Sequence, residues 1–299
     1  MPYRAHRFLI AYLAAYIIGT AALGRALSAV NNMLGIDYSN LSIQMNILIE
    51  PLCLGVCLAG YALLVKKPDR PPLNLRLPSA AQAAVVVAIA LVSAPFAGLI
   101  GAVSAMFFQD TATSYIDSFT RYPFALGVFA VCVIPAVCEE TLMRGVVLSN
   151  YRGVNIAAAA VINGLFFGLF HMNFQQAAYA FALGIVLAYI VYYTGSLVAS
   201  MLAHFTMNAF SVSLAYFMPA RGAASKAAWS DVIAIGRPAA VSLFMIILLL
   251  RVLARMRSAV PESAAGAEGL GRKWLTPSFV VVVLLYAGVC VLFEVMGRA

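Results

Sequence analysis

The sequence predicts an all-α fold, a polytopic transmembrane helix bundle of eight to nine spans with a polar intramembrane cavity. Of its 299 residues, 64% are hydrophobic and only 10% are charged, which is too little polar surface to cover a soluble globule of this size. Apolar runs of about 20 residues, enough to cross a hydrocarbon core of ~30 Å as helix, recur along the whole chain. We therefore expect one membrane domain over residues 1–299.

The apolar runs define nine expected spans, with eight as the alternative. In chain order they are 8–30, 46–65, 80–108, 122–149, 155–171, 174–193, 196–217, 234–254 and 277–296. The first run is too long for a signal-peptide core, so we interpret it as a retained span.

Proline and loop residues predict where these spans bend or stop. Pro51, Pro95 and Pro135 lie inside apolar runs and predict kinks, because proline removes a backbone donor and crowds the preceding turn. Residues 66–72, Lys-Lys-Pro-Asp-Arg-Pro-Pro, predict a loop, and Pro261–Gly271 predicts a flexible linker.

The distribution of basic residues predicts the orientation, because positively charged loops are retained in the cytoplasm. The span ends on the same side of the membrane as the N-terminus carry twelve basic residues: Arg4, Arg7, Lys66, Lys67, Arg70, Arg76, Arg152, Arg251, Arg255, Arg257, Arg272 and Lys273. The opposite ends carry five: Arg121, Arg221, Lys226, Arg237 and Arg298. We expect a multi-pass protein of the cell (plasma) membrane with a cytoplasmic N-terminus.

The formal net charge of +8 does not indicate nucleic-acid binding, since the basic residues are scattered through short loops and form no stripe with interleaved aromatic residues. All five cysteines lie in apolar runs, where a thiol behaves as a small hydrophobic group. Cys53 and Cys57 share a helix face, and we interpret this pair as core packing and not as a metal site.

The first polar cluster is Glu139-Glu140-Thr141-Leu142-Met143-Arg144, within the fourth run. A charge at the bilayer centre costs ~2.5–3.5 kcal/mol, so these side chains need partners or a watery cavity. The i,i+4 spacing predicts an ion pair between Glu140 and Arg144. Glu139 is turned about 100° away from that face and has no such partner. A structural ion pair near the interface remains an alternative to a functional site.

The second cluster closes the fifth run, at Phe167-Gly168-Leu169-Phe170-His171, and a tight turn follows it. A lone histidine at a helix end is often only a hydrogen-bonded interface residue, and Phe167 is equally well explained as packing. Gly164 and Gly168 form a face of small residues that lets another helix approach closely. This approach would also bring His171 near partner side chains.

The third cluster is His204-Phe205-Thr206-Met207-Asn208 in the seventh run. The i,i+4 spacing puts the imidazole of His204 and the carboxamide of Asn208 on one helix face, as two groups that act on one bound atom require. The pair could equally be an interhelical hydrogen-bond contact. Apart from His6 in the basic N-terminal tail, His171 and His204 are the chain's only histidines.

These three motifs, Glu-Glu-x-x-x-Arg at 139–144, Phe-x-x-x-His at 167–171 and His-x-x-x-Asn at 204–208, occur in the order found in the CPBP family (CAAX proteases and bacteriocin-processing enzymes, also called Abi). The family includes the Ras-converting prenyl-protein endopeptidases. The intervening 180–184 and 193–197 are also similar to the family, and the resemblance covers roughly 120–217, which we expect to be a CPBP-like catalytic core.

The resemblance implies an intramembrane endopeptidase that cleaves a membrane-embedded or lipidated peptide. In this scheme Glu139 activates water, His171 holds or polarises that water, and His204 and Asn208 stabilise the oxyanion. Glu140 completes the catalytic set, with Arg144 and Phe167 in supporting roles. The expected partners are membrane lipid and peptide, without nucleic acid.

A metal remains an alternative, because the family is often labelled a metalloprotease. If Zn²⁺ is present, the ligands would be Glu139, His171 and His204, although no His-Glu-x-x-His helix occurs. We favour glutamate-activated water with no obligatory cofactor. Counting ~1.5 Å per residue from the cytoplasmic turns puts His171 roughly 10 Å deeper than Glu139, a mismatch that a bent or tilted helix would remove.

Two other functions fit the same residues. The chain could be a non-catalytic membrane scaffold or peptide-binding protein on the same fold, or a small proton-coupled transporter, since buried Glu and His also suit proton transfer. The absence of an internal repeat in the sequence argues against the transporter.

Overall fold

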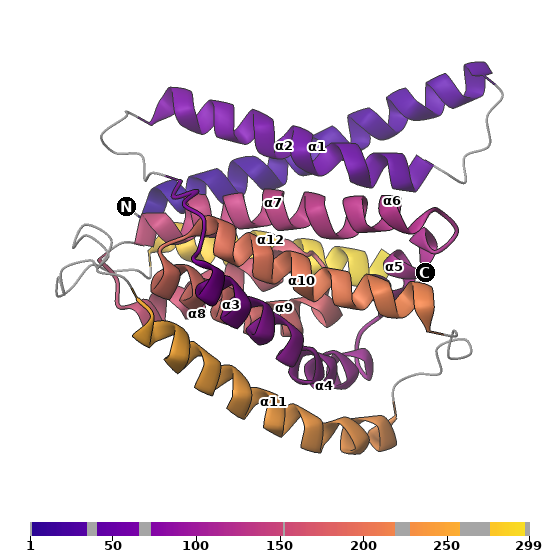
Figure 1. The fold of residues 1–299 in the computed structure, drawn as a ribbon. Coiled ribbons are helices and arrows are strands. Elements are labelled where there is room, and N and C mark those ends of the chain that lie inside the picture. The colour runs from indigo at the N-terminus through magenta and orange to yellow at the C-terminus, as the bar shows by residue number, and fades with distance from the viewer. Residues whose placement is uncertain are drawn as a thin grey trace.

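The structure, a computed structural model, describes residues 2–34, 41–65, 73–151, 153–218, 228–257 and 276–296, and within these ranges it has helices and no strand. The helical segments are α1 Pro2–Leu34, α2 Leu41–Leu64, α3 Ala80–Val92, α4 Ala94–Ala105, α5 Thr111–Phe119, α6 Phe124–Val128, the π-helical η3 Phe129–Val133, α7 Ile134–Glu140, the π-helical η4 Thr141–Val147, the 3₁₀ segment η5 Leu148–Tyr151, α8 Ile156–Phe170, α9 Phe174–Thr194, α10 Leu197–Phe217, α11 Trp229–Arg255 and α12 Pro277–Met296. They pack side by side as a helical bundle, with the α1–α2 pair along one flank and α11 along the opposite flank (Figure 1).

Eight stretches of the described residues are helical, long and apolar enough to cross a membrane, which confirms the predicted polytopic bundle. The expected fifth span, 155–171, corresponds to α8, which has only 15 residues. At 1.5 Å per residue α8 is ~22 Å long, shorter than the hydrocarbon core. Its C-terminal end, at the buried Phe170, therefore lies inside the bundle.

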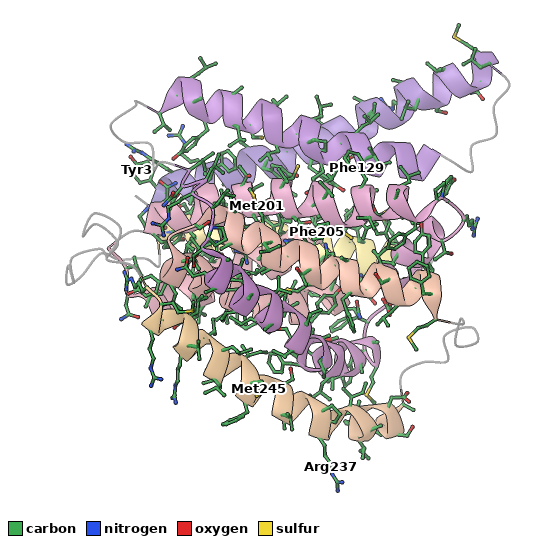
Figure 2. The ribbon with its side chains drawn as sticks, in the orientation of Figure 1. Tyr3, Phe129, Met201, Phe205, Arg237 and Met245 are labelled. Carbon is green, nitrogen blue, oxygen red and sulfur yellow. The ribbon has the colours of Figure 1, made fainter. Side chains whose placement is uncertain are left out.

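Apolar side chains cover the outside of the bundle. Phe129 is 49% exposed, and Ile233 and Phe244 on α11 are 74% and 65% exposed. Figure 2 shows such side chains projecting outward along the length of the helices. The fully buried side chains include the polar Glu140 and Asn163. Apolar groups outside and polar groups inside are the arrangement expected of a protein dissolved in lipid.

Two of the three prolines predicted to bend spans stand where a helix restarts. Pro95 lies in the first turn of α4, directly after the break at Ser93, and Pro135 lies in the first turn of α7, after the π-helical η3. A backbone N–H in the first turn of a helix has no intrahelical acceptor, so a proline there costs no hydrogen bond. Pro51, by contrast, lies inside the continuous helix α2.

Helices α8 and α9 form a hairpin in which glycines allow the two backbones to touch. A Cβ at Gly164 would lie 2.7 Å from the carbonyl oxygen of Phe181, and one at Gly168 would lie 2.5 Å from that of Ala177. Facing them, a Cβ at Gly184 would lie 2.9 Å from the Cα of Gly164. The predicted small-residue face is therefore confirmed, with α9 as its partner.

Hydrogen-bonding side chains fix both ends of α9. Asn173 begins the helix by accepting a hydrogen bond from the Gln176 N–H at 2.8 Å. Gly195 ends it with φ of 63°, a conformation that glycine adopts without steric cost. The segment before α3 holds this second turn, because Arg76 donates to the Thr194 carbonyl at 3.2 Å and Asn74 donates to the Gly195 carbonyl.

The expectation that His6 lies in a basic tail is wrong. His6 is fully buried in α1, where its Nε2 lies 2.6 Å from the Tyr151 hydroxyl and its Nδ1 lies 2.8 Å from the Ser278 hydroxyl. The apolar rings of Phe166 and Phe279 surround it. Because helix α1 begins at Pro2, the ring enters the bundle and ties α1 to η5 and α12.

Some predictions fall on parts of the chain outside the described residues. These are the loop at 66–72, the linker Pro261–Gly271, and Arg152, Arg221, Lys226, Arg272, Lys273 and Arg298. The predicted orientation depends on several of them and stays a prediction.

We predict that Gly168→Ala destabilises the protein by about 1–3 kcal/mol, because the new methyl group would overlap the α9 backbone and force the hairpin apart. Thermal unfolding in detergent measures this loss. The matched control is Gly98→Ala on α4, where an added Cβ meets nothing within 4 Å. The control should leave stability unchanged or raise it slightly, since alanine favours helix. Equal melting temperatures for the two variants would contradict the prediction.

Candidate functional site

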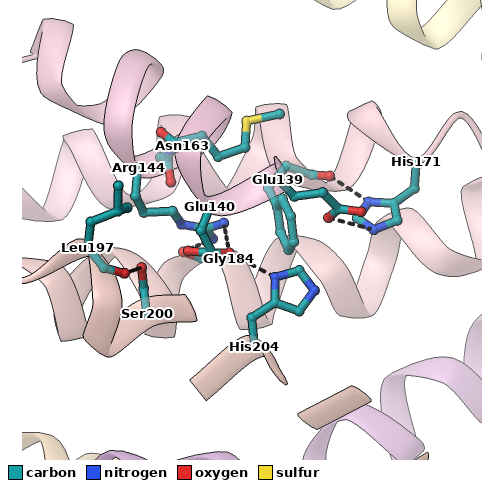
Figure 3. Close-up of polar contacts among 11 residues, drawn as sticks. Glu139, Glu140, Arg144, Asn163, His171, Gly184, Leu197, Ser200 and His204 are labelled. Atoms are coloured by element: carbon teal, nitrogen blue, oxygen red, sulfur yellow. Dashed lines mark hydrogen bonds and ion pairs between the residues drawn. The ribbon is translucent and has the colours of Figure 1, made fainter. Parts of the chain in front are cut away.

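The fourth span supplies the acidic residues of the site. Glu139 and Glu140 are the last two residues of α7, and Arg144 follows in the π-helical η4. Short π-helical segments inside α-helices occur frequently at functional sites because they redirect side chains. The two adjacent carboxylates point in different directions, Glu140 toward α10 and Glu139 toward the end of α8 (Figure 3).

The predicted ion pair between Glu140 and Arg144 is confirmed, with 2.7 Å between Nη1 and Oε1. Both side chains are completely excluded from solvent. The guanidinium also donates to the Gly184 carbonyl at 3.0 Å and lies 4.3 Å from the centre of the Phe167 ring. A buried ion pair is held only where further hydrogen bonds satisfy its remaining groups, and Gly184 supplies one of them.

His204, on α10, bonds to the same oxygen of Glu140. Its Nδ1 lies 2.9 Å from Oε1, which only accepts hydrogen bonds, so Nδ1 carries the hydrogen. The second ring nitrogen, Nε2, is therefore the atom directed away from the ion pair. The hydrogen bond to Glu140 orients the imidazole of His204, as a carboxylate bonded to a functional histidine commonly does.

His171 faces the other glutamate. Its Nδ1 donates to the Phe167 carbonyl at 2.8 Å, so Nε2 is the nitrogen that faces Glu139, 3.6 Å from Oε2. That distance is too long for a direct hydrogen bond. Both side chains are slightly exposed, 12% for His171 and 11% for Glu139, whereas Glu140 is fully buried.

The Phe167 ring stands between the two histidines. Its centre lies 5.0 Å from that of His171 and 5.7 Å from that of His204, both in edge-to-face geometry. With the Arg144 guanidinium also against it, the ring fixes three of the functional side chains relative to one another. Phe167 thus contacts all three side chains, and its supporting role in a reaction stays a prediction.

Asn208 contacts the backbone of the fourth span. Its Nδ2 donates to the carbonyl of Val131, in η3, at 2.9 Å. Asn163, which sequence reasoning missed, donates in the same way to Met143 in η4 at 2.8 Å. Both π-helical segments therefore have a carbonyl bonded by an asparagine, as non-standard backbone within a membrane protein requires. The sequence signal that could have identified Asn163 is its polar amide side chain within the apolar fifth run.

The difference in membrane depth that the sequence predicts between His171 and Glu139 does not keep them apart, since His171 Nε2 and Glu139 Oε2 are 3.6 Å apart. Helix α8 is short and ends beside α7, so the histidine at its C-terminus reaches the carboxylate. The structure thus brings Glu139 to His171, and Glu140 to His204 and Arg144. Asn208 lies on the same helix as His204, and its side chain donates a hydrogen bond to the Val131 carbonyl.

The alternative zinc set of Glu139, His171 and His204 does not assemble. The two histidines contact different glutamates, since His171 faces Glu139 and His204 bonds to Glu140. Within the described ranges of the chain, no group of three or more His, Cys, Asp or Glu side chains is arranged to hold a metal ion. Cys53 and Cys57 are buried free thiols, in line with core packing. In this arrangement the residues do not fit a metal.

A pocket of about 470 Å³ is lined by His171 in the turn between α8 and α9. Its lining also includes Tyr16, Met172, Asn173 and Glu294. Met172 adopts a φ of 52°, an uncommon conformation for a residue with a side chain, in the turn directly after His171. His171 lines this pocket, whereas Glu139, whose Oε2 lies 3.6 Å from His171 Nε2, is not among its lining residues.

Comparison with known proteins gives one match. Residues 121–210 match the family model described as Type II CAAX prenyl endopeptidase Rce1-like, and this segment contains every residue of the three motifs. The match confirms the predicted resemblance for this segment. No curated protein and no solved structure matches the chain.

We predict that Arg144→Leu destabilises the protein by about 3–5 kcal/mol, because it leaves the Glu140 charge buried without its partner. Chemical unfolding in detergent micelles measures the change. The double variant Glu140→Gln/Arg144→Leu removes both charges and should recover much of the stability. Equal stability of the single and double variants would show that the uncompensated charge is not the cause.

Proposed function

We propose that this multi-pass membrane protein, whose residues 121–210 match the Rce1-like CAAX prenyl endopeptidases, is an intramembrane endopeptidase that uses water activated by Glu139. The observation that carries the proposal is the pairing of each motif glutamate with one motif histidine, Glu139 with His171 and Glu140 with His204, across three helices. If the cluster were only a structural ion pair, Glu140 and Arg144 would be enough, and the two histidine partners would not be needed.

Glu139 is the proposed general base. One of its oxygens, Oε2, is buried without a hydrogen-bond partner and lies 3.6 Å from Nε2 of His171, a residue that lines a pocket. A water molecule between Glu139 and His171 Nε2 would be held by both groups and would lose its proton to the carboxylate as its oxygen attacks the scissile carbon. General-base catalysis of this kind contributes ~10²–10⁴-fold.

Glu140 and His204 are proposed to stabilise the tetrahedral intermediate. The Glu140 carboxylate accepts the Nδ1 hydrogen of His204 and so orients the ring, and we propose that the oxyanion accepts an Nε2 hydrogen from this ring. Arg144 and Phe167 hold this couple in place. Asn208 has a second amide hydrogen beyond the one it donates to Val131, and we propose that it assists His204.

After the tetrahedral intermediate forms, the proton on Glu139 passes to the leaving nitrogen, and the carbon–nitrogen bond breaks. The base thereby returns to its charged form. We propose a membrane-embedded or lipidated peptide as substrate, since the surrounding helices present apolar side chains to the lipid. The proposed location is the plasma membrane with a cytoplasmic N-terminus.

We predict that Glu139→Gln lowers peptide cleavage by about 10²–10⁴-fold with little loss of stability, because glutamine keeps the shape but cannot take a proton. The assay is cleavage of a library of lipidated and unlipidated peptides by protein in bilayers, read by mass spectrometry. Asp117→Asn, on the exposed face of α5, is the matched control and should cleave at the wild-type rate. Undiminished cleavage by Glu139→Gln would remove the base, and an unchanged cellular phenotype would favour the scaffold function.

We predict that His204→Leu lowers kcat by about 10²–10³-fold with a smaller effect on KM, because the lost donor acts mainly on the developing charge. Steady-state cleavage kinetics separate the two constants. An effect confined to KM would place His204 in substrate binding instead.

A further inference from the structure

One face of α8 meets the fourth span at three successive positions. Asn163, Phe167 and His171 are four residues apart, a spacing that puts side chains on one side of a helix. The first two contact η4, and the third faces the glutamate at the end of α7. Phe167 and His171 belong to the motifs, whereas Asn163 has no part in them.

The contact made by Asn163 is a direct hydrogen bond between α8 and the fourth span. Its Nδ2 donates to the Met143 carbonyl at 2.8 Å. The same carbonyl accepts the N–H of Leu148, five residues further on, which is a π-helical bond of η4. One oxygen thus joins the π-helical turn to α8. The pair His171–Glu139, 3.6 Å apart, is too distant for a direct hydrogen bond and does not itself hold the helix in place.

Packing alone does not account for an amide at this position. Asn163 is completely buried, and its Oδ1 has no hydrogen-bond partner among the described residues. A leucine has the same branched shape and would bury no polar atom, so it would avoid this cost. What asparagine adds over an apolar side chain is the hydrogen bond from Nδ2 to the fourth span.

We propose that Asn163 is a positioning residue of the site. Its hydrogen bond to Met143 fixes α8 against the fourth span and so sets the separation of His171 from Glu139, where the attacking water is held. The inference rests on the proposed function, because the water belongs to that mechanism. Asn163 lies about two helical turns before His171 and on the Arg144 side of the site, so it acts through the helix and not on the reacting atoms (Figure 3).

The first test measures geometry and needs no catalysis. The structure directs Nε2 of His171 at Glu139 but Nδ1 of His204 at Glu140. Solid-state NMR of the reconstituted protein measures the dipolar coupling between isotope-labelled glutamate carboxyl carbons and histidine labelled at one ring nitrogen. Label at Nε2 reports mainly the first pair, and label at Nδ1 reports the second. We expect Asn163→Leu to weaken the Nε2 coupling and to keep the Nδ1 coupling, because the second pair joins the fourth span to α10. An unchanged Nε2 coupling, or equal loss of both, would overturn the proposal.

Reference variants make this measurement specific. Glu139→Gln gives the background from other labelled pairs, including any from Glu294, which lines the neighbouring pocket. Asn150→Leu is the matched control, since Asn150 is also a buried amide and donates to a carbonyl of η4 and to a hydroxyl on α2. It should retain both couplings. Asn163→Ala removes the same donor without an apolar branch and repeats the test should the leucine variant fold poorly.

The second test is kinetic. At equal amounts of folded protein, we expect Asn163→Leu to lower kcat for peptide cleavage by about 10–100-fold with a smaller effect on KM, because a misplacement of ~1 Å can cost ~10²-fold. Asn150→Leu should keep the wild-type kcat. A loss confined to KM, or an equal loss of kcat in the two variants, would contradict a positioning role.

The two tests separate this inference from the proposed function. If wild-type protein cleaves no peptide while Asn163→Leu weakens the Nε2 coupling, the positioning of His171 stands and the proposed function fails. If cleavage depends on Glu139 while Asn163→Leu keeps both the coupling and kcat, the proposed function stands and the role of Asn163 fails.

Discussion

The buried ion pair between Glu140 and Arg144 is the interaction on which the rest of the site depends. Two full charges without solvent are stable only when further polar contacts surround them. The Gly184 carbonyl and the His204 imidazole supply hydrogen bonds from α9 and α10, and Phe167 supplies an aromatic face from α8. The need to satisfy one ion pair thus joins four segments of the chain and fixes the orientation of one histidine.

The close approach of α8 and α9 makes these contacts geometrically available. Gly164 and Gly184 allow the backbones to touch, so the carbonyl of Gly184 reaches Arg144 while Phe167 packs beside it. The short length of α8 then leaves His171 inside the bundle and next to Glu139. A glycine face that looks like simple packing therefore also determines which polar side chains meet.

Hydrogen bonds satisfy the buried polar side chains of the site only in part. Asn163 and Asn208 donate to backbone carbonyls of the π-helical segments, a task that stabilises the irregular fourth span. Glu139 Oε2 is buried without a hydrogen-bond partner within the described part of the chain, and so are Glu140 Oε2, Arg144 Nε and Asn163 Oδ1. An unpartnered buried polar group costs stability, so the cluster as a whole is held at a cost in stability.

The sequence by itself determined membrane residence, the positions of most spans and the Glu140–Arg144 pair, because each follows from hydrophobicity or from the helical period between near neighbours. Only the tertiary structure decided which histidine meets which glutamate, that Asn208 bonds to Val131, and that His6 is buried. These contacts join residues far apart in the chain. They depend on helix tilt, length and the close packing of glycines, which local periodicity does not encode.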